Sequence, residues 1–378
     1  MERARQQSKK TDKSKKPSRE FEEIGRPGWR VELVRENDEV TGIKISGEGG
    51  GIRLFQLRAS LTGELREIVH FQGFMPNGLP PDPLVPVYMV SDVEGLFGRT
   101  CPECKSYFRT NNTVEDTICP YCGHYNHCLA FTTPNQQEYV KKYCELINKA
   151  VEEGTDLVFD LNQIVDELPE NRPQWVYTEE RQQKLFTCQN CGTIVDILGD
   201  YGGCPRCGRL NYSEVIGAKL DELENQLTLV DENVTDRGER EVEWEKLLRS
   251  VSEFEALAND VRKQLLRIPA TPRRKADLGY LSFQNIKHAN DIINNWFGFE
   301  ILKGIADDDR LFMNKMFNRR HVFTHKAGIV DQEYLDNTGD GSVKLNQKIR
   351  LRSNEIKRLL PLVRQAAMNL IEGYESIS

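Results

Sequence analysis

The sequence lacks any long apolar run. No stretch approaches the roughly 18 residues that a membrane-spanning helix needs, so we predict no membrane association. The first 20 residues, MERARQQSKKTDKSKKPSRE, also lack the apolar segment of a secretory signal. We therefore expect a cytoplasmic protein. Residues 1–20 carry eight Lys or Arg against three Asp or Glu, which predicts a disordered basic tail, either merely solubilising or steering RNA or a partner.

The chain also lacks an excess of positive charge. Its 378 residues have a net charge of −7, so contact with nucleic acid must come from local patches. Hydrophobic residues at 38% and charged residues at 29% are typical of a folded chain with polar surfaces and exclude a wholly disordered one. The length is sufficient for two or three domains.

Residues 21–98 have the pattern of a small β-rich domain. Four short alternating or β-branched runs, WRVELV, TGIKI, IRLFQLR and LREIVHF, are separated by turn residues. The next stretch, MPNGLPPDPLVP, is rich in proline, which excludes a helix and a central strand. His70 alternates with apolar neighbours, so we interpret it as structural and assign this domain no chemistry.

Helical patterns follow in two regions. In the linker region 132–183, Thr133, Pro134 and Gln136 predict a helix start, and Gly154 predicts its end. Cys144 lies on the apolar stripe of this helix and is expected to be a small buried hydrophobe. Residues 213–378 predict an all-α bundle, with helices near 281–296, 308–325 and 353–374. The expected fold is therefore a multidomain α+β protein.

Eight of the ten cysteines fall in C-x-x-C pairs. Residues 99–131 contain Cys101, Cys104, Cys119 and Cys122, and residues 184–212 contain Cys188, Cys191, Cys204 and Cys207. Two such pairs place four thiolates around one tetrahedral ion, so the spacing predicts two zinc ribbons that hold two Zn²⁺ ions per chain. Four sulfur ligands leave no open position for water, which predicts structural and not catalytic ions.

Two questions about the ribbons stay open in the sequence. His124, His127 and Cys128 follow the first cluster closely, and one of them can replace a cysteine ligand. Basic and aromatic residues surround both clusters, at Lys105, Tyr107, Phe108, Arg109, Tyr121, Tyr125, Arg206, Arg209 and Tyr212. They either pad modules that have little core or dock RNA, DNA or a protein.

The segment RRHVFTH, residues 319–325, holds two arginines and two of the six histidines. His321 and His325 are four residues apart and share a helix face, whereas Val322 and Phe323 face the core. Cleavage of RNA without a metal needs a base for the 2′-hydroxyl, an acid for the leaving oxygen and positive charge on the phosphate. Histidine titrates near neutral pH, and arginine forks onto two phosphate oxygens.

In this region the sequence resembles the HEPN superfamily, small helical bundles common in bacterial toxins, defence proteins and RNA-processing enzymes. The family motif is Arg, a polar residue, three residues and His, which Arg320-His321-Val322-Phe323-Thr324-His325 matches, and the trailing G-I-V-D-x-x-Y is also familiar. The resemblance covers residues 240–378 and is best over 281–350. It implies a metal-independent endoribonuclease whose homodimer brings two motifs into one cleft.

In that interpretation Arg320 and His325 are catalytic, His321 is a polar support, RNA is the substrate, and an antitoxin or other partner protein is a candidate regulator. A second interpretation is a HEPN-like module that binds RNA, a nucleotide or a protein without cutting. A third uses His321 and His325 as a metal-ligand pair, but HVFTH lacks the glutamate of a zinc hydrolase. A solvated helix end is the simplest alternative.

Overall fold

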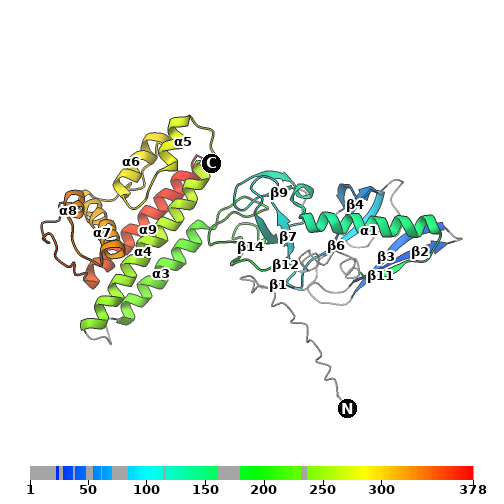
Figure 1. The fold of residues 1–378 in the computed structure, drawn as a ribbon, viewed down its shortest axis with the longest axis horizontal. Helices are drawn as coiled ribbons and strands as arrows, with labels where there is room; N and C mark the ends of the chain where they lie inside the picture. Colours follow the sequence, from blue (N-terminus) through cyan, green and yellow to red (C-terminus); the bar gives the residue numbers. More distant parts are fainter. Residues whose placement is uncertain are drawn as a thin grey trace, which may run out of the picture. The chain divides into compact units, whose positions relative to one another are not determined.

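The computed structural model describes residues 23–24, 29–36, 39–47, 54–60, 62–69, 84–113, 116–160, 179–230 and 236–377 (Figure 1). The predicted tail at residues 1–20, His70 and part of the linker region therefore lie outside the described residues. The chain divides into two compact units, Met1–Thr117 with Tyr125–Leu198, and Ile118–His124 with Gly199–Ser378. No helix in the described ranges is long and apolar enough to cross a membrane.

The first unit contains small antiparallel sheets. One has the strand order β11-β2-β3 and another the order β5-β4-β6, where the strands are β2 (Trp29–Glu36), β3 (Glu39–Gly47), β4 (Leu54–Ser60), β5 (Leu65–Val69), β6 (Leu84–Val90) and β11 (Val158–Asp160). The four predicted β-rich runs are thus confirmed as strands β2 to β5. Pro86 lies in β6, an edge strand, where its missing N–H removes no central ladder bond.

Helix α1 (Pro134–Glu153) supplies the apolar cover for these sheets. Thr133 and Gln136 form the predicted capping box, and Gly154 ends the helix in the left-handed conformation. The buried face of α1 includes Tyr143, whose ring packs edge-on against Phe159 of β11 at 5.4 Å between centroids. Cys144 is fully buried on the same face, so its predicted role as a core residue is confirmed.

Short hairpins hold the C-x-x-C pairs. The strands are β7 (Phe97–Thr100), β8 (Tyr107–Thr110), β9 (Asp116–Ile118), β10 (Tyr125–His127), β13 (Lys184–Thr187) and β14 (Ile194–Ile197). Strands β13, β14, β8 and β7 form one antiparallel sheet, and β9 pairs with β10. A two-residue pair of β1 (Glu23–Ile24) with β12 (Glu179–Glu180) and the 3₁₀ turn η1 (Cys128–Phe131) complete the described elements of this part.

The second unit is helical. Its helices are α3 (Tyr212–Val230), α4 (Asp236–Leu265), α5 (Pro272–Gly279), α6 (Ile286–Phe297), α7 (Asp307–Lys326), α8 (Gln332–Thr338) and α9 (Ser353–Glu375). Helices α3, α4 and α9 lie side by side, and α7 packs on α4 (Figure 1). The apolar stripe of α4, including Leu247, Val251, Phe254, Val261 and Leu265, is fully buried in this bundle. This stripe therefore belongs to the core of the bundle and is not available as a surface for a dimer.

Candidate functional site

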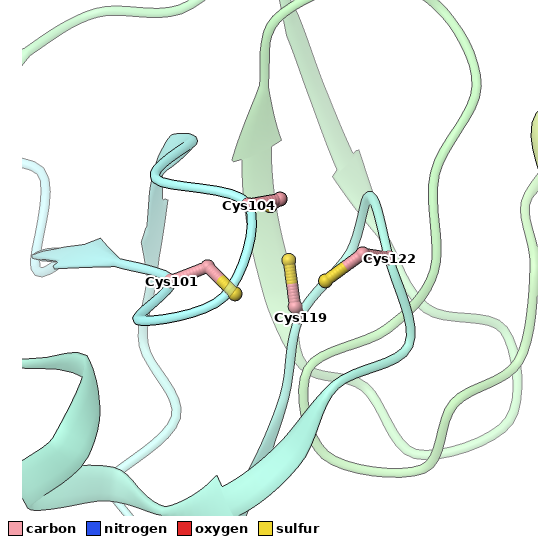
Figure 2. A group of neighbouring side chains, drawn as sticks. All are labelled: Cys101, Cys104, Cys119 and Cys122. Atoms are coloured by element: carbon pink, nitrogen blue, oxygen red, sulfur yellow. The ribbon is translucent and has the colours of Figure 1, made fainter. Parts of the chain in front are cut away.

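Four cysteine sulfurs converge at the first cluster. Cys101 and Cys104 lie between β7 and β8, Cys119 and Cys122 lie between β9 and β10, and the four Sγ atoms are within 4.8 Å of one another (Figure 2). Cys101 and Cys119 are buried, and the other two are half-buried. This is the spacing that one tetrahedral metal ion requires, with no other described side chain in the ligand group.

The second cluster repeats the arrangement. Cys188 and Cys191 lie between β13 and β14, and Cys204 and Cys207 lie in a turn closed by a bridge between Gly203 and Leu210. Their sulfurs again lie within 4.8 Å of one another. In the part of the chain that the structure describes, these two groups are the only ones with three or more residues placed to hold a metal. The structure thus forms two groups of four cysteines, each of which could hold one metal ion.

Each cysteine pair sits in the same tight turn. The carbonyl of the first cysteine accepts a hydrogen bond from the amide four residues later, at 2.9 to 3.0 Å in all four cases. That amide belongs to a residue with positive φ, which is Gly123, Gly192 and Gly208 in three turns and Lys105 in the remaining one. Glycine adopts this conformation without a Cβ clash, which explains why a glycine directly follows three of the four C-x-x-C pairs.

The surroundings of the clusters favour padding over docking for several of the residues singled out. Phe108, Arg109 and Tyr212 are fully buried. Arg109 forms ion pairs with Asp92 and Asp196, and Tyr212 donates its hydroxyl hydrogen bond to Asp260. These side chains cannot stack on a base or reach a phosphate. His127 uses Nδ1 to accept the amide of Leu129 and is absent from the ligand group, as are His124 and Cys128.

The two arginines of RRHVFTH have different environments. Arg319 is 4% exposed and forms ion pairs with Asp340 at 3.1 Å and Glu355 at 2.9 Å. Its Nε also donates to the hydroxyl of Tyr334 at 3.2 Å. Burial raises the pKa of Asp340, but hydrogen bonds from Ser342, Tyr334 and Arg319 outweigh it and hold that pKa well below its usual range. Arg319 therefore ties α7 to α8 and α9 and is unavailable to a substrate.

Arg320 points toward α4. Its Nη2 lies 2.9 Å from Glu255 Oε2 and 3.4 Å from Ser252 Oγ. Both Arg320 and Glu255 are largely buried, and burial raises the pKa of the Glu255 carboxyl although Arg320 lowers it. Arg320 Nε and Glu255 Oε1 have no hydrogen-bond partner, so neither group is saturated. Sequence reasoning missed Glu255, because it lies 65 positions before Arg320 and only the packing of α4 on α7 brings the two together.

His321 and His325 form an imidazole pair at the C-terminal end of α7. Their ring centroids are 4.7 Å apart, with the planes inclined at 47°. His321 is half-buried, and His325 is exposed. Burial lowers the pKa of His321, and the nearby positive charges of His325, Lys326 and Arg320 lower it further against an opposing effect of Glu333. The structure thus brings His321 beside His325, whereas the guanidinium of Arg320 is held on α4.

The segments that follow α7 expose apolar side chains. Gly328, with φ of 79°, turns the chain after α7, and the backbone from 328 to 330 pairs with residues 346 to 349. Ile329 lies on the first of these segments and Leu345 directly precedes the second, and they are 46% and 49% exposed. No third ligand accompanies His321 and His325 among the described side chains, so the metal interpretation of this pair gains no support.

Comparison with family models, curated proteins and solved structures finds no match to this chain.

Proposed function

We propose that the chain is a metal-independent endoribonuclease of HEPN type, with its active site at the end of α7. The observation that carries the proposal is the imidazole pair of half-buried His321 and exposed His325, which follows Arg320 on α7. Burial and the charge of His325 lower the pKa of His321, which favours its neutral form, so that it can support proton transfer by His325 without adding charge. His325 moves the proton at the 2′-oxygen or the leaving oxygen.

Arg320 is the charge that stabilises the phosphate in the transition state. It reaches a phosphate only if the pair with Glu255 opens. A phosphate offers two oxygens to the fork of the guanidinium, whereas Glu255 engages Nη2 through one oxygen. Substrate binding therefore replaces one partner of Arg320 with a stronger one.

A single motif has too few groups for both proton transfers, so the active form is a homodimer with two motifs in one cleft. Exposed Ile329 and Leu345, in the segments that follow α7, supply apolar surface for such a contact. A twofold pair is the commonest symmetric assembly. Light scattering at micromolar concentration tests this point, and a strict monomer at all concentrations used for cleavage would contradict it.

The test of activity is incubation of the purified chain with total RNA, with and without chelator, followed by analysis of the new ends. Cleavage through the 2′-hydroxyl leaves 2′,3′-cyclic phosphates, spares DNA and survives a chelator that leaves the clusters folded. His325→Ala should lose about 10²–10⁴ in rate, and Arg320→Lys should also be impaired because an ammonium cannot fork. His288→Ala, at an exposed histidine of α6, is the matched control and should keep full activity.

One observation favours a second function, a module that binds RNA, a nucleotide or a protein without cutting. The Arg320–Glu255 pair occupies the phosphate-binding group in the free chain. That function predicts RNA retained on the protein, no new ends, and no rate for His325→Ala to reduce. Intact RNA after incubation with the dimer, in the presence of cell extract as a source of triggers or antitoxin, would establish the binding module in place of the enzyme.

We also propose that the two clusters hold structural Zn²⁺. Four thiolates close a tetrahedral shell, and such a site contributes its binding free energy to folding. Elemental analysis of gently purified protein should give about two zinc ions per chain. Cys104→Ser should remove about one of them, whereas Cys144→Ser, at a core cysteine outside both clusters, should leave the zinc content unchanged.

A further inference from the structure

Positive charge gathers on one short stretch of the helical unit. Residues 261–290 contain seven Lys or Arg and a single acidic residue, Asp277, in a chain whose net charge is −7. The basic residues are Arg262, Lys263, Arg267, Arg273, Arg274, Lys275 and Lys287. The stretch covers the end of α4, all of α5 and the start of α6. A local patch of this kind is what a chain without a global positive field needs in order to meet a polyanion.

Tyr280 stands at the end of α5 within this stretch and is 91% exposed. Its backbone is nevertheless fixed. The guanidinium of Arg262 donates to the carbonyl of Leu281 at 2.7 Å and to that of Gly279 at 3.4 Å, and the Tyr280 amide donates to Ala276. The turn is thus held on both sides while the ring meets solvent. An aromatic ring presented in this way leaves its apolar faces free for a partner.

Two basic residues that precede Tyr280 on α5 are exposed and form no ion pair with a described residue. Arg273 lies seven residues earlier on α5, which places it on the same helix face about 10 Å along the axis. Arg273 and Lys275 are exposed, and no described carboxylate forms an ion pair with either. The single acid, Asp277, accepts a hydrogen bond from the indole of Trp296 at 3.0 Å. Other basic residues of the stretch are engaged within the chain. Arg274 stacks on Phe297 at 3.9 Å and Lys263 pairs with Asp260 at 3.8 Å. Arg262 and Arg267 donate to backbone carbonyls.

We propose that Arg273 and Tyr280 bind single-stranded nucleic acid, with a base stacked on Tyr280 and a phosphate against Arg273. Stacking requires an unpaired base, so a duplex fits the ring poorly. An acidic protein would use the charge but need not place a planar group on the ring. Nucleic acid carries a base and a phosphate in every nucleotide, so it supplies both chemistries together.

This surface is separate from the imidazole pair. Helix α7 runs antiparallel to α4, because Phe317 packs on Phe254 and Phe323 packs on Trp244. His325 therefore lies near the start of α4, and α5 follows its end, about 30 Å away by helix rise. Binding at Tyr280 does not depend on RNA cleavage, so either proposal can fail alone.

The test is fluorescence anisotropy of the full-length, zinc-loaded chain with a labelled 12-nucleotide strand. The strand is prepared as DNA and as 2′-O-methyl RNA, neither of which can be cleaved through a 2′-oxygen. Tyr280→Ala should weaken binding at least about fivefold, whereas Tyr280→Phe, which keeps the ring, should stay within about twofold. Arg273→Ala should reduce the slope of log affinity against log salt by about 0.7.

Two control variants distinguish binding at a specific site from nonspecific binding through charge or exposed hydrophobic side chains. Leu311→Ala removes an apolar side chain that is 69% exposed on α7, and Lys303→Ala removes an exposed charge outside the stretch. Both should bind as the unaltered chain does. The proposal is overturned if Tyr280→Ala loses no more affinity than Leu311→Ala, if the duplex binds as tightly as the single strand, or if polyglutamate competes as well as the unlabelled strand.

Discussion

Replacement of Arg319 by methionine should unfold the helical unit at a much lower denaturant concentration than replacement of its neighbour Arg320. Arg319 is buried between Asp340 and Glu355 and also donates to Tyr334. Arg319→Met leaves two carboxylates without their cation, one of them almost fully buried. Removal of one partner of a buried ion pair costs about 3–5 kcal/mol, which for a unit of this size lowers the melting temperature by about 6–20 °C.

Arg320→Met is the matched comparison. Arg320 forms one ion pair, with Glu255, whereas Arg319 forms two and donates a further hydrogen bond to Tyr334. We expect a loss of about 1–2 kcal/mol. Urea unfolding at pH 7, followed by circular dichroism at 222 nm, measures both values. Equal losses for the two variants, or a loss below about 1 kcal/mol for Arg319→Met, would refute the assignment of Arg319 to the framework and of Arg320 to the site.

Three further outcomes are expected. Gly328→Ala should cost about 1–3 kcal/mol in the same unfolding assay, because φ is 79° and a Cβ would lie 2.8 Å from Phe323 and Trp244; unchanged stability would contradict it. Burial and His325 lower the pKa of His321, so its imidazole should titrate below about 6.5 by NMR and move upward in His325→Ala. The corresponding stability contribution is lost as pH falls, because the unfolded histidine takes its proton first. Burial, with a smaller effect of Glu145, raises the pKa of Cys144 to about 12, so iodoacetamide at pH 8 should label it far more slowly than free cysteine, and equal rates would count against the core assignment.

Local signals in the sequence predicted the elements that local chemistry determines. Thr133, Pro134, Gln136 and Gly154 bracket α1, and the four C-x-x-C pairs meet as two groups. Helices expected at 281–296, 308–325 and 353–374 appear at 286–297, 307–326 and 353–375. The first begins later because Asn285 caps it.

Other features depend on contacts that spacing does not reveal. Helix α8 is not among the predicted helices, because seven residues are too few to display a helical period. Helix α5 begins with Thr271 as its N-cap and Pro272 as its first residue, the same Thr-Pro pair that predicted the start of α1. It was not predicted, because it has no apolar stripe. The different roles of Arg319 and Arg320 were also invisible, since they follow from acids on α4, α9 and the segment after α8.

The end of α7 is ordered by non-covalent contacts within the chain, and these form without a ligand. Helix ends normally fray, with opening free energies near zero. Here the amide of Gly328 returns to the carbonyl of Val322, its own carbonyl accepts from Ile349, and the rings of Trp244 and Phe323 close over the turn. Fraying would have to break all of these contacts together. The entropy of fixing the backbone that carries the two imidazoles is thus lost during folding, and a ligand that binds there needs to order only the side chains.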